Sequence, residues 1–316
     1  MSPLSALQGA LWGQFVGDAA SLGAHWIYDL DDMASQFPGG ISGFETPKKG
    51  HYHEGKRSGD QTHYGDAALL LLESVAACGE FREADFAMRF EAFFRRPNCK
   101  SYRDHATRET LANLDAEPGN YQNGAHDDEP ATVTRLAPVV VAYRHRDSEI
   151  FNDAIRRLTL VTQNHPTALA CVPACAELLR HLLTGMAFSE AFELTRKSAA
   201  VSCDGSDYLE FAHMMREVDV ITATGRFGQA CPLPQSLPSA LQAALHHQDN
   251  FQDAILNTVR AGGDSAGRAA MVGYWLGASL GVQAIPAGWI EKLRERERIQ
   301  TAIDQLLARC GEQKVG

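Results

Sequence analysis

The chain has 316 residues, 45% of them hydrophobic, and a formal net charge of −10 at pH 7. This composition allows a large buried core, and the negative charge argues against nucleic acid or an anionic membrane surface as partner. The most apolar stretch, Ala269–Val282, is too short to span a bilayer, and no signal peptide is recognisable. Seven cysteines without a CxxC pair are typical of a reducing compartment, so we expect a cytoplasmic protein.

The first predicted helix, Ser5–Ser21, carries a glycine at every fourth position: Gly9, Gly13 and Gly17. Glycine costs roughly 1 kcal/mol relative to alanine inside a helix, so three on one face need an explanation. Close approach of another backbone is the usual one. Asp18 follows this ridge directly.

A long irregular segment, Phe37–Gly65, comes next, and structureless loops of this length are often functional. Its polar residues include His51, His53, Asp60, Thr62 and His63. It leads into a helix at about Tyr64, where polar groups at a helix N-terminus suit a phosphate or a metal-bound phosphate. The alternative is a solvated loop whose histidines have no special role.

Helical periodicity dominates the rest of the chain. Apolar faces at Leu69–Ala76 and Phe86–Phe94 predict two helices. Seven further helices are predicted, over Thr132–Arg144, Ile150–Val161, Thr167–Leu183, Ser189–Ala200, Tyr208–Thr222, Leu237–His246 and Phe251–Thr258. Alternating β patterns and linker-like stretches are absent, so the predicted fold class is all-α, with a single domain over residues 1–316.

A second glycine ridge lies in the last predicted helix of the series, Arg268–Val282, at Gly273, Gly277 and Gly281. We expect this helix to cross Ser5–Ser21 along the two ridges. The crossing would bring the helix ends near Asp18 and Asp264 together in one acidic cleft.

Four segments, in this order along the chain, resemble motifs of the ADP-ribosylglycohydrolases. They are Gly17-Asp18-Ala19, the stretch from Thr62 to Glu73-Ser74, Asn164-His165-Pro166-Thr167-Ala168, and Gly262-Gly263-Asp264-Ser265. The resemblance implies an orthogonal all-α bundle with a two-magnesium cleft that hydrolyses an N- or O-glycosidic bond of ADP-ribose. It also implies an ADP-ribose-like ligand or an ADP-ribosylated substrate as partner, and no organic cofactor.

The sequence departs from the family pattern at the metal ligands. The family places Thr-Asp-Asp at one helix start and Asp-Asp-Thr at the other, and the matching residues here are Thr62, His63, Tyr64, Asp264, Ala266 and Gly267. Only Thr62 and Asp264 keep a metal-ligating side chain. Because Mg²⁺ prefers oxygen ligands, the sequence predicts a degenerate magnesium site without a pair of ions.

Three interpretations remain open. In the first, a remodelled hydrolase uses Asp66, His63 and Asp264 in catalysis, with Asp66 one helical turn beyond Thr62. Its predicted ligand-binding residues are Asp18, His25, Asp29 and His165 for the substrate and Thr62 and Asp264 for a metal. In the second, the protein is not catalytic and binds an ADP-ribose-like nucleotide or serves a structural role. The stretches Ala24–Asp29 and Thr62–Asp66 resemble a branch of the family that includes the jellyfish J1 crystallins.

The third interpretation is a transition-metal protein that uses His51, His53, His63 and Asp264. His25 and His63 are also candidate ligands for a softer metal such as Zn²⁺, or candidate general bases, because an imidazole titrates near neutral pH.

Overall fold

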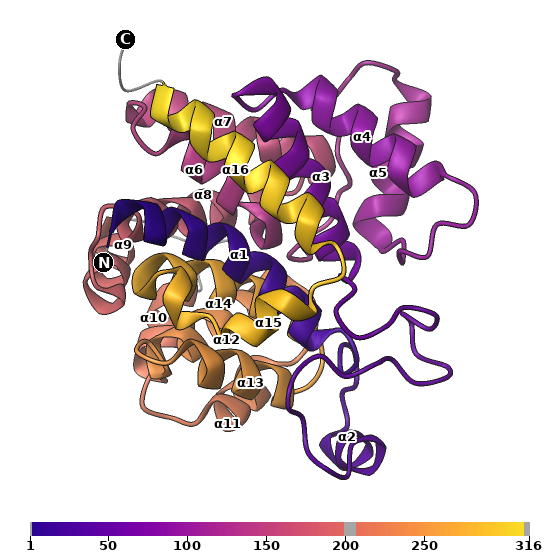
Figure 1. The fold of residues 1–316 in the computed structure, drawn as a ribbon, viewed down its shortest axis with the longest axis vertical. Coiled ribbons are helices and arrows are strands. Elements are labelled where there is room, and N and C mark those ends of the chain that lie inside the picture. The colour runs from indigo at the N-terminus through magenta and orange to yellow at the C-terminus, as the bar shows by residue number, and fades with distance from the viewer. Residues whose placement is uncertain (1, 199–206, 313–316) are drawn as a thin grey trace.

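Helices α1 (Pro3–Ser21) and α14 (Ser265–Leu280) pass each other at backbone contact in the middle of the molecule (Figure 1). A Cβ atom added at Gly9 would overlap the carbonyl oxygen of Gly277, and one added at Gly277 would overlap that of Gly9. In the same way, a Cβ atom at Gly13 would overlap the carbonyl oxygen of Gly273, and one at Gly273 would overlap that of Gly13. The crossing predicted from the two glycine ridges is therefore confirmed, and the absence of side chains there lets the two backbones touch.

The structure is a computed structural model that describes residues 2–198 and 207–312. Within these ranges the chain forms α-helices, two short 3₁₀ turns (Val133–Arg135 and Val282–Ala284) and isolated β-bridges, but no strand. The remaining helices are α2 (Leu30–Gln36), α3 (His63–Cys78), α4 (Glu83–Arg95), α5 (His105–Ala116), α6 (Ala137–Tyr143), α7 (Ser148–Thr162), α8 (Pro166–Leu182), α9 (Phe188–Ser198), α10 (Tyr208–Met214), α11 (Val220–Phe227), α12 (Leu233–His246), α13 (Phe251–Arg260), α15 (Ala287–Lys292) and α16 (Arg296–Glu312). The all-α fold class is confirmed.

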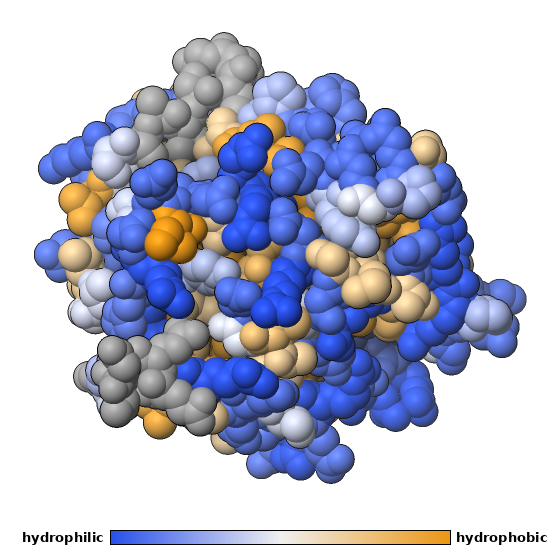
Figure 2. Space-filling view, turned by 90° about the horizontal axis from the view of Figure 1, so that it is seen from above, coloured by the Kyte–Doolittle hydropathy of each residue, from blue (hydrophilic) through white to orange (hydrophobic). Residues whose placement is uncertain are grey.

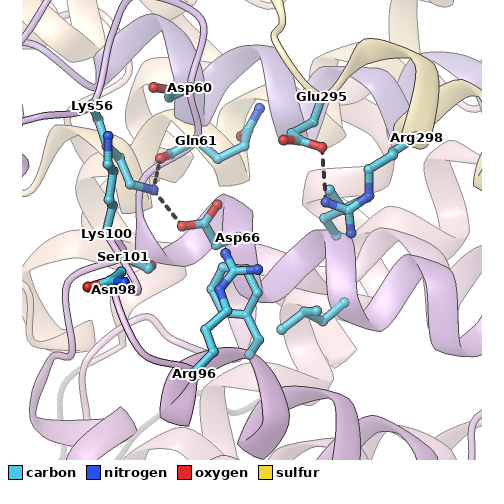
Figure 3. Close-up of a pocket in the computed structure, with 13 residues that line it drawn as sticks. Lys56, Asp60, Gln61, Asp66, Arg96, Asn98, Lys100, Ser101, Glu295 and Arg298 are labelled. Atoms are coloured by element: carbon cyan, nitrogen blue, oxygen red, sulfur yellow. Dashed lines mark hydrogen bonds and ion pairs between the residues drawn. The ribbon is translucent and has the colours of Figure 1, made fainter.

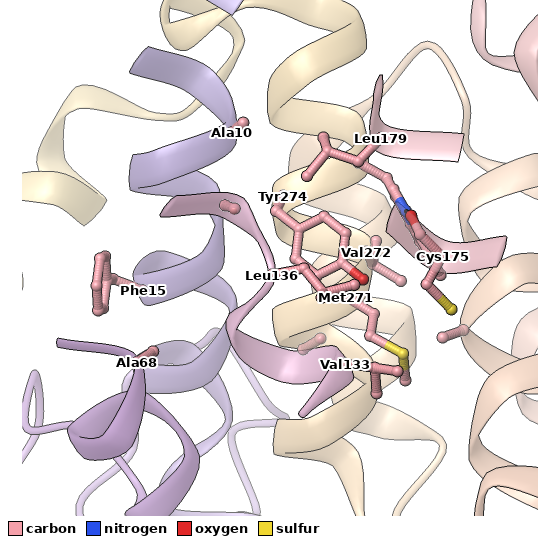
Figure 4. Packing of buried hydrophobic residues seen from close by; sticks show 14 of the residues in the cluster. Ala10, Phe15, Ala68, Val133, Leu136, Cys175, Leu179, Met271, Val272 and Tyr274 are labelled. Atoms are coloured by element: carbon pink, nitrogen blue, oxygen red, sulfur yellow. Dashed lines mark hydrogen bonds between the residues drawn. The ribbon is translucent and has the colours of Figure 1, made fainter. Parts of the chain in front are cut away.

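The other helices surround the central pair. In the view of Figure 1, α3, α4, α5, α7 and α16 lie above α1, and α11 and α13 lie below it. One continuous hydrophobic cluster includes residues from α1 through α16. Figure 4 shows part of it, with Cys175 and Leu179 of α8 beside Tyr274 of α14. Cys171 and Cys175 are both buried in this core.

Two of the predicted helices are interrupted in the structure. The single helix expected over Tyr208–Thr222 is wrong, because α10 ends at Met214 and α11 begins only at Val220. The Asp219 carboxylate accepts a hydrogen bond from the Thr222 backbone N–H at 2.9 Å and so starts a new helix. The segment Thr132–Arg144 opens with a 3₁₀ turn, and α6 follows with Pro138 in its first turn.

Some helices were not predicted from the sequence, among them α2, α5 and the long α16. Each of α2 and α5 is short and begins at a capping aspartate, Asp29 or Asp104. The helix predicted over Ser189–Ala200 corresponds to α9, and its last two residues lie outside the described part of the chain.

The segment between α2 and α3 contains no helix, in agreement with the predicted loop. It packs back onto the bundle, since the Phe44 N–H donates to the Ala20 carbonyl at 3.0 Å and Arg260 donates to the Ile41 carbonyl at 2.8 Å. The molecular face in Figure 2 is mostly hydrophilic, with small separate hydrophobic patches. Within residues 2–198 and 207–312, no helix has both the length and the hydrophobicity that a bilayer span requires.

Candidate functional site

Asp264 lies at the start of α14 because two glycines before it take a left-handed conformation. Gly262 and Gly263 have φ angles of 72° and 64°, and a Cβ at Gly263 would overlap the Gln229 backbone. This bend lets the Gly263 N–H donate to the Ile27 carbonyl at 2.8 Å, while the Trp26 N–H donates to the Gly263 carbonyl at 2.7 Å. The segment after α1 is thereby joined to the start of α14.

The Asp264 carboxylate is fully buried among polar side chains. Tyr64 Oη donates to its Oδ2 at 3.4 Å, and His25 Nδ1 lies 3.5 Å from its Oδ1. Burial raises the pKa of Asp264, although the nearby Arg268 and His63 side chains act in the opposite direction. The structure thus brings together three of the residues predicted for the site, Asp264, His25 and His63.

Thr62 and Asp18 fix the start of α3 on the end of α1. Thr62 caps α3 by accepting a hydrogen bond from the Tyr64 N–H at 3.2 Å. Its hydroxyl donates to Asp18 Oδ1, and its backbone N–H donates to Asp18 Oδ2 at 2.7 Å. Burial raises the pKa of Asp18 to about 6, although the hydrogen bonds from Thr62 lower it. Both Thr62 and Asp18 are therefore engaged with each other.

Asp66 faces a different cavity, one of about 280 Å³ (Figure 3). Lys56 Nζ donates to Asp66 Oδ2 and to the Gln61 carbonyl, each at 2.5 Å. Lys100 and Arg96 line the same cavity, as Figure 3 shows. Asp66 is thus neutralised by a lysine of the preceding loop, in surroundings rich in cationic side chains.

Three histidine rings pack together next to Asp264. The ring centroids of His25 and His53 lie 5.5 Å apart, those of His53 and His63 lie 5.7 Å apart, and those of His25 and His63 lie 6.0 Å apart. Burial lowers the pKa of His25 and of His53 well below the usual value, and the neighbouring histidines add to the effect. The nitrogens of these three rings are close enough to one another for a metal ion to bind them together.

An aromatic pocket of about 230 Å³ opens beside these histidines. Its walls include Trp26, Tyr52 and Tyr102, and its polar groups include Asp104 and Glu129. The Trp26 ring packs against Tyr52 at 5.1 Å and against Tyr102 at 5.0 Å between centroids. A pocket with apolar walls and a few convergent polar groups is the usual form of a small-molecule site.

Two carboxyl groups in this pocket differ in protonation. Burial alone raises the pKa of Asp104, but the His63 imidazole and hydrogen bonds from Thr107 lower it to about 2. For Glu129, burial and the nearby Asp127 and Asp104 carboxylates raise the pKa to about 8. At neutral pH Asp104 is therefore ionised and Glu129 mostly carries its proton.

Sequence reasoning did not identify Asp104 or Glu129, because neither lies in a recognisable motif. Asp104 precedes the unpredicted helix α5, and Glu129 lies in the irregular stretch before α6. The structure places two other predicted residues at helix starts. Asp29 is exposed and caps α2, whereas His165 caps α8 and packs on His126 at 4.5 Å between ring centroids. Their predicted substrate contacts remain untested.

The all-helical fold of this chain is found among solved structures. It matches an ADP-ribosylglycohydrolase-related protein complex with a TM-score of 0.71 and 24% identity, over 98% of this chain and 99% of the other. Residues 1–315 match the family model described as ADP-ribosylglycohydrolase, and the chain therefore belongs to the ADP-ribosylglycohydrolase family.

Proteins similar to this chain carry different names. The chain is similar to Crystallin J1A of Tripedalia cystophora, with 24% identity over 94% of each chain. It is equally similar to the ADP-ribosyl-[dinitrogen reductase] glycohydrolase of Rhodospirillum rubrum, with 24% identity over 96% of each. The ADP-ribosylarginine hydrolase Tri1 of Pseudomonas putida is 26% identical over 97% of this chain and 79% of its own length.

Proposed function

We propose that this protein hydrolyses a ribosyl N- or O-glycosidic bond in the aromatic pocket, with Glu129 as general acid and Asp104 as electrostatic stabiliser. The observation that carries the proposal is the Glu129 carboxyl. It is half-buried, its Oε2 has no hydrogen-bond partner, and it shares the pocket with the buried Asp104. A carboxylic acid and a carboxylate around one site are the usual machinery of glycoside hydrolysis.

The two carboxyl groups suit different steps. Glu129 holds a proton near neutral pH, because burial and Asp127 raise its pKa to about 8, and it donates that proton to the leaving nitrogen or oxygen as the glycosidic bond breaks. The ribosyl carbon then carries positive charge, which the Asp104 carboxylate stabilises. Water adds to this carbon and returns a proton to Glu129. Such a division between a desolvated acid and a hydrogen-bonded carboxylate is known from other glycosidases.

Asp104 is held in place for this role. Its Oδ1 accepts a hydrogen bond from the Thr107 N–H at 2.7 Å, and its Oδ2 lies 3.3 Å from His63 Nε2. Because both oxygens are engaged, Asp104 fits a fixed negative charge better than a mobile base. In this proposal His63 is a positioning residue for Asp104.

The magnesium pair implied by the family does not fit the donor set found here. At the six matching positions the side-chain oxygens belong to Thr62, Tyr64 and Asp264 alone, and Thr62 is hydrogen-bonded to Asp18. The Tyr64 hydroxyl contacts Asp264 at 3.4 Å, where a metal would need that carboxylate. A single buried carboxylate is a poor match for two hydrated Mg²⁺ ions, so no step is assigned to them.

The substrate class follows from the relatives and from the pocket together. Two of the relatives are named as hydrolases of ADP-ribosylated molecules. The rings of Trp26, Tyr52 and Tyr102 offer stacking surfaces for a nucleoside, and Arg108 in the same lining offers a cation for a phosphate. We therefore assign an ADP-ribosyl group as the ligand.

The other residues predicted from the sequence remain proposals. For Asp264, predicted from the sequence as a catalytic and metal-ligating residue, we propose a positioning role instead, because it accepts a hydrogen bond from the Tyr64 hydroxyl and lies beside His25 behind the pocket. The catalytic role of Asp66 is less consistent with its ion pair to Lys56. It is tested directly by Asp66→Asn in the assay below.

A second candidate is a non-catalytic protein that binds an ADP-ribose-like nucleotide or serves a structural role. The observation that favours it is the Tyr64 hydroxyl at Asp264, in a chain whose relatives include two proteins named crystallins. In this case the aromatic pocket binds its ligand without breaking a bond.

The deciding experiment is a turnover assay with ADP-ribosyl-arginine and ADP-ribosyl-serine, combined with calorimetric titration of ADP-ribose. Glu129→Gln should lower kcat by about 10²–10⁴-fold, and Asp104→Asn should also lower it. The matched control is Glu109→Gln on α5, since Glu109 is partly exposed and pairs with His105. ADP-ribose binding without turnover would support the second candidate. Fast cleavage that requires Mg²⁺ and survives Glu129→Gln would overturn the proposed mechanism.

A further inference from the structure

We propose that His25, His53 and His63 form a binding site for one transition-metal ion of the Zn²⁺ class. The three residues come from separate parts of the chain: the turn after α1, the loop between α2 and α3, and the first residue of α3. Each ring offers a nitrogen within 4.8 Å of the other two. The side chains are 0%, 0% and 2% exposed.

Most nitrogens of this cluster lack a hydrogen-bond partner. His25 Nε2 and both ring nitrogens of His53 and of His63 are buried without a hydrogen bond, whereas His25 Nδ1 accepts one from the Ala266 N–H at 3.3 Å. Buried polar atoms are almost always paired in folded proteins, because an unpaired one loses its hydration without compensation. A metal ion bound by one nitrogen from each ring would satisfy three of these atoms at once.

The spacing of the rings fits a single ion. The centroids form a triangle with sides of 5.5, 5.7 and 6.0 Å, whose centre lies about 3.3 Å from each centroid. A Zn–N bond of about 2.0–2.1 Å puts the ion roughly 3.2 Å from the centroid of a ligating imidazole. The separation of the three rings therefore matches a single ion bound between them.

Two carboxylates stand behind the proposed ligands. Asp104 Oδ2 lies 3.3 Å from His63 Nε2, and Asp264 Oδ1 lies 3.5 Å from His25 Nδ1. A carboxylate that accepts the second ring N–H is the common outer partner of a metal-bound histidine. This arrangement leaves His63 Nδ1 and His25 Nε2, neither of which has a hydrogen bond, as the ligand atoms. His25 Nδ1 accepts a hydrogen bond from the Ala266 N–H at 3.3 Å, so a metal bound at Nε2 would move the ring proton to Nδ1 and shift its hydrogen bond from Ala266 to Asp264.

His51 holds the cluster together without being a ligand. Its Nδ1 accepts a hydrogen bond from the His53 backbone N–H at 3.0 Å, so its Nε2 carries the proton and donates to the His25 carbonyl at 2.7 Å. The sequence had grouped His51 with His53, His63 and Asp264 as ligands. The geometry replaces His51 with His25 and makes Asp264 an outer partner.

The ligand type excludes Mg²⁺ from this site. Imidazole suits Zn²⁺, Cu²⁺ and Ni²⁺, whereas Mg²⁺ requires oxygen ligands. Trp26 packs on all three rings, at 4.2, 5.5 and 5.2 Å between centroids, and also lines the aromatic pocket. The ion would therefore lie behind the pocket wall, and its binding does not depend on the proposed hydrolysis.

The test uses the full chain, stripped of metal with a chelator and titrated calorimetrically with Zn²⁺ and, separately, with Mg²⁺. We expect one Zn²⁺ per chain and no binding of Mg²⁺ at the same site. His53→Gln and His63→Gln should each weaken Zn²⁺ binding by about 10-fold or more, and Asp104→Asn by about 10–100-fold. His126→Gln is the matched control, because His126 is exposed and lies outside the cluster.

Near-UV circular dichroism checks that each variant is folded. If a histidine variant unfolds, the visible spectrum of the Co²⁺-loaded wild type gives the answer, because four-coordinate Co²⁺ absorbs far more strongly than six-coordinate Co²⁺. The absence of saturable Zn²⁺ binding would overturn the proposal. So would a folded His53→Gln variant that binds Zn²⁺ as tightly as the wild type, or a six-coordinate Co²⁺ spectrum.

Discussion

Adding one methyl group at Gly277 should have the opposite effect on stability from adding one at Gly225. Both glycines lie inside helices, α14 and α11. In both, alanine is favoured over glycine by roughly 1 kcal/mol from helix propensity alone. The packing around them differs: a Cβ at Gly277 would overlap the Gly9 carbonyl oxygen, whereas a Cβ at Gly225 has no atom within 4 Å.

The cost at Gly277 follows from this overlap. The clashing atom belongs to the backbone of a buried helix, so it cannot rotate away, and α1 and α14 must move apart. Overpacking of this kind costs about 1–3 kcal/mol. Separation at Gly277 also loosens the neighbouring contact between Gly13 and Gly273, so we expect the upper end of the range. After the propensity gain, Gly277→Ala should lose about 2 kcal/mol, while Gly225→Ala should gain up to about 1 kcal/mol.

The measurement is urea unfolding followed by far-UV circular dichroism, with the slope of the transition compared among the three proteins. An unchanged slope means that the midpoint shift reports stability. Gly9→Ala should behave like Gly277→Ala, and the double variant should lose less than the sum, because one separation relieves both overlaps. A Gly277→Ala variant as stable as the wild type, or shifted in the same direction as Gly225→Ala, would refute the close-contact explanation.

Three further predictions concern the carboxyl groups of Glu129 and Asp66. The native pKa of Glu129, about 8, exceeds its ordinary value of 4.5, so between these values the folded protein keeps a proton that the unfolded chain releases. The free energy of unfolding, measured by urea unfolding at several pH values, should therefore fall as the pH rises from 5 to 8. It should fall less steeply in Glu129→Gln. In the turnover assay, kcat of the wild type should decline above about pH 8 as Glu129 loses its proton, and it should not differ between EDTA and millimolar MgCl₂. Lys56→Met leaves the mostly buried Asp66 carboxylate without its cation and should lower the free energy of unfolding by about 3 kcal/mol. Lys56→Met combined with Asp66→Leu should recover most of that stability, and an equal loss in both variants would contradict the ion-pair explanation.

The fold was predictable where the sequence pattern has only one physical explanation. The two glycine ridges predicted a helix crossing between segments more than 200 residues apart, because glycine at four-residue spacing has little other use in a soluble helix. The break between α10 and α11 was not predictable from periodicity. It depends on one side chain, Asp219, that caps a helix in preference to continuing the preceding one.

The site was predictable only in part, because some of its residues lie outside any sequence motif. Asp264, Thr62 and His63 lie in motifs at helix starts, so the sequence placed them near one another. Asp104 and Glu129 lie in irregular segments that only the folded chain brings to the same pocket. The pKa of Glu129 is raised by burial and by the neighbouring carboxylates, and that of Asp104 is lowered by His63 and Thr107 against the effect of burial; a sequence displays none of these contacts.

The contact between α1 and α14 also constrains the order in which the polypeptide acquires its structure during synthesis. Helix α1 emerges from the ribosome well before α14, which carries the surface that covers its glycine stripe. Until α14 is made, the backbone along the glycine stripe of α1 is uncovered. Pairings of such high sequence separation slow folding and leave apolar surface exposed to aggregation. A truncation that removes α14 should therefore abolish native structure around α1 as well.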